Sequence, residues 1–334
     1  MRWKVISLFA VVVLSASCTS TKNTTSQEDD YTCYVNPFIG TDFTGNTYPG
    51  AQVPFGMVQL SPDNGLPGWD RIAGYFYPDS TIAGFSHTHL SGTGAGDLYD
   101  ISFMPVTLPY NEAEAPLGIH SKFSHQNEQA TAGYYQVMLT DYNINVELTA
   151  TERCGIQRYT FPKANAAIFL NLSKAMNWDA TQDSHIEKVD SVTIRGYRYS
   201  DGWARNQKIY FCTRFSRPFE NMTLDTVAIE KEGKVIGKGV VARFDYTTQD
   251  NEQILLSTGI SGVSMEGAAR NLNAEAGKDD FDYYRAQAAD VWNRELGKIK
   301  VESDNVDDKT VFYTALYHSM PVSYTHLRAH ETPE

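Results

Sequence analysis

Between residues 134 and 259 the chain alternates apolar and polar residues with a period of two. The stretch YYQVMLTDYNINVELTATERCGIQRYTF, residues 134–161, holds three such runs separated by turn residues. Further runs follow at residues 166–173, 191–199, 208–215, 240–246 and 252–259. Many short strands with this alternation are typical of two packed antiparallel sheets, so we predict an antiparallel β-sandwich.

The period changes after Gly262. In residues 279–297, DDFDYYRAQAADVWNRELG, the apolar side chains recur at helical spacing, acidic residues precede them and a glycine follows. Residues 309–320, KTVFYTALYHSM, predict a second helix. A run of strands followed by helices predicts a mainly β protein whose β-domain is joined to an α-domain.

Residues 31–109 are dense in glycine and proline and contain few long periodic runs. This composition predicts short strands joined by long, shaped loops. Loops of this length inside a compact domain usually carry function.

The N-terminus has the pattern of an export signal. Residues 1–4 carry two positive charges, residues 5–14 are apolar, and small residues lead to Cys18. The apolar run is too short to span a bilayer. We interpret Cys18 as a bacterial lipoprotein lipidation site, with plain secretory cleavage as the alternative, and residues 19–30 as a flexible tether.

Composition and net charge argue against some classes of function. A net charge of −12 at pH 7 argues against nucleic-acid binding, which needs a basic surface. The apolar share of 42% and the aromatic share of 12% suffice for a large core. Beyond Cys18 the chain has Cys33, Cys154 and Cys212, whose spacing does not suggest zinc, and we expect buried, inert thiols.

The segment FSHTHLSGTGAGD, residues 85–97, contains two histidines among glycines. On a strand His87 and His89 would share one face, and Asp97 or Asp100 could add an oxygen ligand for a metal ion. The alternative is that both rings are hydrogen-bonded inside the fold. The glycines allow close backbone approach but do not form a phosphate-binding loop.

A second candidate is GWDR, residues 68–71, in a glycine-flanked loop. The indole of Trp69 could cover the apolar face of a sugar while Asp70 and Arg71 bond to hydroxyl groups. The alternative is a core tryptophan beside a surface ion pair. Trp178 and Trp203 also stand next to polar residues, which is a weaker signal.

The spacing of acidic residues assigns no catalytic acid and base, since a glycosidase brings its two carboxylates together through the fold. The sequences G-x-S-x-G and HExxH are both missing, so serine-hydrolase and zinc-protease functions have no support.

Five segments together resemble glycoside hydrolase family 92. They are VNPFIGTD, NTYPGAQVPFGMVQLSPD, GYFYPDSTIAGFSHTHLSGTG, VWNRELGKI and FYTALYHS, in the family's order from about Tyr31 to Met320. The resemblance implies an N-terminal β-sandwich, a helical linker and a C-terminal (α/α)6 barrel. It also implies a bacterial, exported exo-α-mannosidase that releases terminal mannose from glycans with inversion.

The family resemblance further implies Ca²⁺ that grips the mannose O2 and O3, a glutamate acid and an aspartate base. All of these belong to the C-terminal barrel, so we assign no catalytic or metal-ligating residue in this chain. The expected substrate-binding residues, as pocket wall or support, are Trp69, Asp70, His87, His89 and Asn46.

The predicted organisation is a signal peptide at 1–18, a tether at 19–30, a β-sandwich at 31–262, a helical linker at 263–300 and the start of a truncated barrel at 301–320. Pro321 interrupts the last helix, and we interpret residues 321–334 as translated adapter sequence at a broken assembly end. The protein would then be the inactive N-terminal half of an outer-membrane, cell-surface or periplasmic enzyme of a Gram-negative bacterium.

Two alternatives remain open. One is a stand-alone carbohydrate-binding β-sandwich with Trp69 as its platform. The other is a metal-dependent hydrolase that uses His87 and His89. Contact with a membrane is expected only through the lipid anchor.

Overall fold

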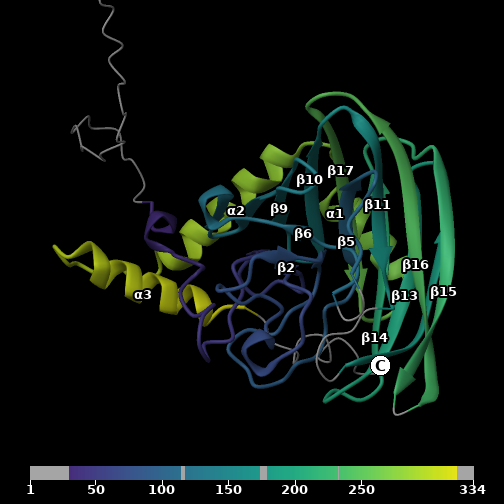
Figure 1. Ribbon diagram of the computed structural model, residues 1–334. Helices are drawn as coiled ribbons and strands as arrows, with labels where there is room; N and C mark the ends of the chain where they lie inside the picture. Colours follow the sequence, from purple (N-terminus) through teal and green to yellow (C-terminus); the bar gives the residue numbers. More distant parts are fainter. Residues whose placement is uncertain (1–29, 114–116, 174–178, 232, 322–334) are drawn as a thin grey trace, which may run out of the picture.

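The computed structural model describes residues 30–113, 117–173, 179–231 and 233–321. Over these ranges two antiparallel sheets pack against each other, and three α-helices follow them in the chain (Figure 1). The predicted mainly β fold, an antiparallel β-sandwich followed by helices, is confirmed. Signal peptide, Cys18, Trp178 and nearly all of the predicted artefact at 321–334 lie outside the described residues.

The first sheet has seven strands. In spatial order they are β1 (Ala51–Gln52), β2 (Gln59–Asp63), β4 (Gly84–Ser86), β5 (Ser102–Thr107), β11 (Ala164–Asn171), β16 (Lys234–Thr248) and β15 (Asn221–Lys231). The N-terminal half of the chain therefore supplies one side of this sheet, and the long hairpin β15–β16 supplies the opposite edge.

The second sheet has eight strands. In spatial order they are β12 (Ala180–Lys188), β13 (Thr193–Asp201), β14 (Gln207–Phe215), β17 (Glu252–Ser261), β10 (Cys154–Phe161), β9 (Ile144–Ala150), β8 (Tyr134–Leu139) and β7 (Glu128–Thr131). A separate pair, β3 (Thr81–Ile82) and β6 (Ser121–Lys122), lies within the loop-rich part.

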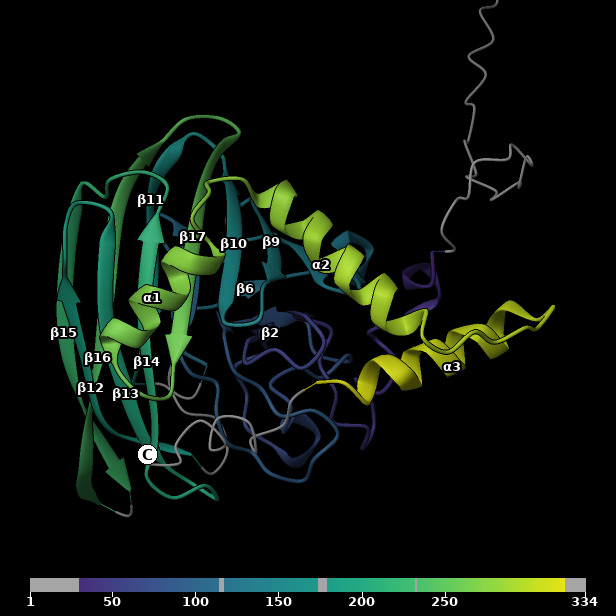
Figure 2. The same ribbon diagram turned by 180° about the vertical axis from the view of Figure 1, so that it is seen from behind.

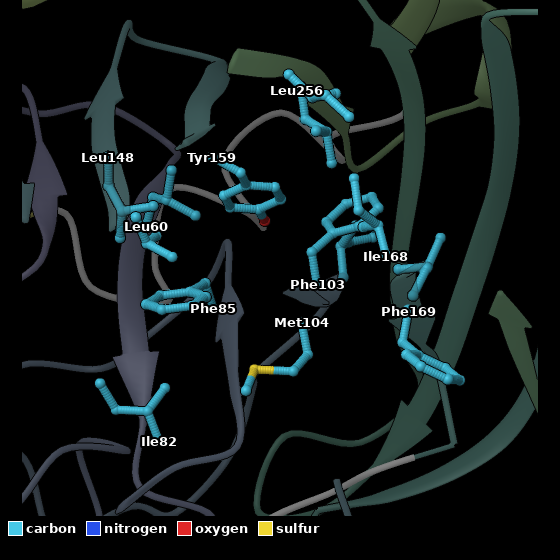
Figure 3. Packing of buried hydrophobic residues seen from close by; sticks show 14 of the residues in the cluster. Leu60, Ile82, Phe85, Phe103, Met104, Leu148, Tyr159, Ile168, Phe169 and Leu256 are labelled. Atoms are coloured by element: carbon cyan, nitrogen blue, oxygen red, sulfur yellow. The ribbon is translucent and has the colours of Figure 1, made fainter. Parts of the chain in front are cut away.

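The core lies between the two sheets, because one face of each strand turns inward. In β13 every second residue is buried, as expected for a strand with one face in the core. Phe103 of β5 meets Phe215 of β14 edge to face, with 6.4 Å between ring centroids. Figure 3 shows Phe85 and Phe103 beside Tyr159 of β10 in this core.

Each helix begins at a side-chain cap. Ser264 caps α1 (Met265–Glu275), Asp280 caps α2 (Phe281–Leu296) and Asn305 caps α3 (Val306–His318), and each accepts a first-turn backbone N–H. The sequence predicted α2 closely, placed the start of α3 three residues late, and did not separate α1 from the linker. α1 covers the outer face of the eight-stranded sheet at β14 and β17 (Figure 2).

The last two helices hold the first described residues. Asn293 Oδ1 of α2 accepts from the N–H of Tyr31 at 2.7 Å. Thr314 Oγ1 of α3 accepts from the N–H of Asn36 at 3.0 Å. The indole of Trp292 is fully buried and donates to the carbonyl of Gln52 at 2.7 Å. Residues 31–55 and the helices thus form one packed unit.

The three described cysteines are free thiols. Cys154 and Cys212 are buried as expected, and burial raises the pKa of both thiols. The expectation was wrong for Cys33, which is exposed next to the short helix Thr32–Tyr34. Within the described ranges, no helix combines the length and apolar character that a bilayer span requires.

Candidate functional site

The glycine-rich segment of residues 87–100 forms a closed loop between β4 and β5. The N–H of His87 donates to the carbonyl of Asp100 at 2.8 Å, and the N–H of Tyr99 donates to that of Thr88 at 3.0 Å. Strand β4 ends at Ser86, so the two histidines do not lie on a strand as the sequence analysis assumed.

The same loop contains strained backbone. Leu98, Tyr99 and Ile101 are not glycines, yet their φ angles are 85°, 65° and 59°. Each such residue costs about 1–3 kcal/mol, and such residues cluster at functional sites. The strain makes this loop the strongest functional candidate in the described fold.

His87 is fully buried inside the sandwich. Its Nδ1 donates to the carbonyl of Ile101 at 2.8 Å, whereas Nε2 has no hydrogen-bond partner among the described residues. A Cβ atom on Gly155 would lie 2.7 Å from this Nε2, so the ring packs against bare backbone. Burial lowers the pKa of His87 to about 4, which keeps the ring neutral at pH 7.

His89 is also buried and contacts two strands, β2 and β4. Nδ1 donates to the carbonyl of Gln59 at 2.7 Å, and Nε2 lies 2.9 Å from Oδ1 of Asp63. Ser86 Oγ lies 3.1 Å from the same nitrogen. Both histidines therefore anchor the start of the loop inside the fold, and neither presents a ring to solvent.

The described residues contain no group of three histidine, cysteine or acidic side chains placed to hold a metal ion. The two acidic candidates have other partners. Asp97 accepts backbone N–H groups from the turn between β13 and β14, and Asp100 accepts from Arg198. The metal-hydrolase alternative thus has no third ligand in this part of the chain.

Arg198 and its two carboxylates form a buried ionic network behind the loop. Its guanidinium lies 2.5 Å from Asp100 and 2.6 Å from Asp179, and Nε donates to Thr181 at 2.9 Å. Burial lowers the pKa of Arg198, but the two carboxylates outweigh this effect and the net shift is upward. The network joins the glycine-rich loop to β12 and β13.

Trp69 lies on the short helix Trp69–Arg71 and is 58% exposed, so it is not a core tryptophan. A Cβ on Gly94 would lie 3.7 Å from Cη2 of this indole, which places the ring against the glycine-rich loop. Asp70 is exposed. Arg71 pairs with Asp79, with Nε 2.6 Å from Oδ2.

Asn46 lies in a neighbouring loop with a left-handed φ of 51°. Its carbonyl accepts from the N–H of Gly92 at 2.7 Å. Its side-chain Oδ1 is buried and has no hydrogen-bond partner among the described residues. The glycine-rich loop therefore contacts both Asn46 and Trp69, while its own two histidines are buried inside the fold.

Two cavities lie elsewhere in the described fold. One, of about 660 Å³, is lined by Tyr31, Tyr34 and residues 300–304 with Lys309 and Tyr313. The other, of about 560 Å³, lies between α1, α2 and the turn between β9 and β10. None of the five predicted substrate-binding residues lines either cavity.

Sequence reasoning did not find the network around Arg198 or the role of Asp97. These side chains meet across about a hundred residues of chain, since Asp97 accepts from Trp203 and Asp100 from Arg198. A buried arginine in a strand whose inward residues are otherwise apolar or small was the only signal available.

A sandwich with a strained, tryptophan-bearing loop surface is compatible with a carbohydrate-active protein, and the comparisons identify the class. Residues 34–261 match the model of the glycosyl hydrolase family 92 N-terminal domain, and residues 267–331 match that of the family's catalytic domain. The chain belongs to glycoside hydrolase family 92, the GH92 α-mannosidase family, and contains its N-terminal domain with a short part of the catalytic domain.

The structural relatives agree. A GH92 α-mannosidase from Bacteroides thetaiotaomicron, solved in complex with mannoimidazole, is 34% identical with a TM-score of 0.80, over 87% of this chain and 40% of that one. A GH92 inverting mannosidase of the same bacterium is 27% identical with a TM-score of 0.71, over 90% and 40%.

Among curated proteins, an uncharacterized secreted glycosidase of Arthroderma benhamiae is 25% identical over 89% of this chain and 42% of its own length. The chain therefore spans about two fifths of the length of these relatives.

Proposed function

We propose that this chain provides the N-terminal wall of the sugar site of an exported, inverting exo-α-mannosidase that releases terminal mannose from glycans. The observation that carries the proposal is the exposed indole of Trp69, which packs on a strained glycine-rich loop in a chain that belongs to this family. The relatives named as an α-mannosidase and as an inverting mannosidase support the substrate class.

The residues divide into contact and support. Trp69 would cover the apolar face of the sugar, and Asp70 and Asn46 would bond to its hydroxyl groups. His87 and His89 are both buried. They would anchor the loop so that Trp69 and Asn46 can contact the sugar. The acid and base would come from the catalytic domain, as the family resemblance implies.

Calcium does not fit the residues described here. No three suitable side chains are grouped in the described ranges, and the two carboxylates of the loop already have partners, since Asp97 accepts backbone amide protons and Asp100 pairs with Arg198. A Ca²⁺ ion would therefore be held by the catalytic domain, and we derive no step through it from this chain.

The test is a fusion of residues 31–320 with the remaining catalytic domain of the 34% identical Bacteroides α-mannosidase. We expect turnover of terminal α-mannosides, and we expect Trp69→Ala to reduce kcat/KM at least about tenfold, which is about 1.4 kcal/mol of transition-state stabilisation. Val235→Ala, at a site 67% exposed on the β15–β16 hairpin, is the matched control.

A fusion that unfolds cooperatively but turns over no faster than the catalytic domain alone would contradict the proposal. So would equal rates for the Trp69→Ala and Val235→Ala fusions.

The exposure of Trp69 also favours a second candidate, a stand-alone carbohydrate-binding module. This function requires that the 334-residue chain alone bind mannose in calorimetry and lose the binding in Trp69→Ala. The mannosidase proposal expects only weak, millimolar binding and therefore little heat from the same titration, because the catalytic domain would supply the rest of the sugar site.

We also propose export, with a lipid anchor at Cys18. The charged and apolar start of the chain and the secreted relative support this. Metabolic labelling with palmitate in a Gram-negative host should label the protein, and Cys18→Ser should abolish the label. Unlabelled protein in the periplasm would show that the protein is exported without a lipid anchor at Cys18.

A further inference from the structure

The turn between β13 and β14 is built to present one tryptophan. Asp201 pairs with Arg205 at 2.9 Å and accepts the N–H of Asn206 at 3.2 Å. The N–H of Gly202 donates to the carbonyl of Ala204 at 3.0 Å, which closes the turn. Trp203 lies at its tip and is 68% exposed.

Asp97, in the glycine-rich loop, holds the backbone of this turn from the buried side. Its buried carboxylate accepts the N–H of Trp203 at 3.1 Å and that of Ala204 at 2.6 Å. A Cβ on Gly202 would lie 2.6 Å from Asp97 Oδ1, so only glycine permits this approach. A buried carboxylate that accepts two amide protons is a strong constraint, and here it fixes the backbone while the indole remains outside.

The two exposed indoles are attached to opposite ends of one short segment. Trp69 packs on Gly94, and the backbone of Trp203 bonds to Asp97. Three residue steps of extended chain span at most about 10 Å, so the contact points of Trp69 and of the Trp203 turn on this segment lie close together. Phe43, three residues before Asn46 and 80% exposed, adds a third ring to the loops that contact this segment.

Large apolar side chains that are exposed together mark binding surfaces more reliably than single ones. A rigidly held indole binds a sugar ring well, because the C–H face of the sugar stacks on the ring and little side-chain entropy is lost. The second indole, Trp203, could therefore contact a further sugar unit when the bound glycan is longer than one sugar.

We propose that Trp203 is a specificity-determining residue that stacks on a second sugar unit of a mannose-containing oligosaccharide, next to the unit held at Trp69. This inference rests on the proposed function, since Trp69 defines the first position. Trp203 would then contribute to the binding of oligosaccharides and contribute nothing to the binding of a single mannose.

The test is saturation-transfer NMR on the 334-residue chain, with methyl α-mannoside and a branched α-mannopentaose at millimolar concentration. In the unsubstituted chain we expect stronger saturation of the pentaose than of the monosaccharide. Trp203→Ala should lower the pentaose signal at least twofold and leave the monosaccharide signal unchanged, and Trp203→Phe should restore part of the difference. Val235→Ala is the control for loss of an exposed apolar side chain, and cooperative melting of each variant verifies folding.

The variants separate the two proposals. If Trp69→Ala lowers both signals while Trp203→Ala changes neither, the second sugar position is wrong and the first stands. If Trp203→Ala lowers the pentaose signal while Trp69→Ala changes nothing, the role of Trp203 stands and that of Trp69 is wrong. Equal signals in all variants, or no saturation at all, would overturn the inference about Trp203.

Discussion

The guanidinium of Arg198 and the carboxylate of Asp100 lie 2.5 Å apart, and both side chains are fully shielded from solvent. The pair connects a strand of one sheet to the loop that carries the candidate site. Asp179 on the opposite side of Arg198 extends the pair to a triad. The loop is therefore held by a buried ionic triad in addition to its buried apolar side chains.

Removal of the Arg198 cation should strongly lower the stability of the fold. Arg198→Met leaves two buried carboxylates without their partner and should lower the free energy of unfolding by about 3–5 kcal/mol. Urea denaturation measures this change. Arg205→Ala removes a surface pair and should change the free energy of unfolding by no more than about 1 kcal/mol. If both variants lose the same small amount, the triad does not stabilise the fold.

The free energy of unfolding should decrease as the pH falls, because protonation of His87 is favoured in the unfolded chain. Its pKa is about 4 in the folded protein, because burial disfavours the charged ring, against about 6.5 in the unfolded chain. The unfolded state then binds a proton first as the pH falls, so stability decreases from about pH 6.5 to pH 4, by about 3 kcal/mol in total.

His87→Asn keeps a side-chain donor for the carbonyl of Ile101 and cannot take up a proton. Its stability should therefore change less across this pH window than that of the unsubstituted chain. Urea unfolding at pH 7, 5.5 and 4 gives both profiles, and parallel profiles would show that His87 does not cause the dependence.

Asp97→Asn tests the constraint on the Trp203 turn. The amide keeps one acceptor oxygen and loses the charge, so the variant should be less stable by about 1–3 kcal/mol. Hydrogen exchange of the Trp203 and Ala204 amides should accelerate by at least tenfold while that of core strands stays slow. Unchanged exchange at these two amides would mean that the turn is stable without the Asp97 carboxylate.

Calcium should not stabilise the 334-residue chain. A ligand at a hundredfold excess over its Kd adds about 2.7 kcal/mol, which a thermal melt detects easily. We expect the same Tm, to within about 1 °C, in EDTA and in millimolar Ca²⁺, because no described group of side chains suits the ion. A clear rise in Tm with Ca²⁺ would contradict this assignment.

The sequence predicted those parts of the fold whose side chains alternate sharply. The segments that became β8, β9 and β10 each have one face in the core, and their pattern was clear. The edge strand β15 was missed because the alternation of its apolar residues breaks at residues 225–226, and its side chains are mostly exposed. Helix α3 starts three residues early because Asn305 caps it, which apolar spacing does not reveal.

The candidate site was predictable only in part. Trp69 was identified from the residues of its own loop, but its exposure depends on where the glycine-rich loop lies. The histidines were expected on a strand that in fact ends at Ser86. Asp97 and Arg198 act through contacts to residues far away in sequence, and short-range patterns carry no information about such pairs. The domain boundaries and the five substrate-binding residues stay predictions.

The bond between the N–H of Tyr31 and Asn293 spans 262 residues, so it sets an order of events during synthesis. At about 5–20 residues per second, the ribosome needs roughly 13–52 s to make the second partner after the first. During that interval residues 31–55 have emerged but lack the helices that bury them. The N-terminal segment is thus among the first parts of this unit to be made, but it cannot be buried until α2 and α3 exist.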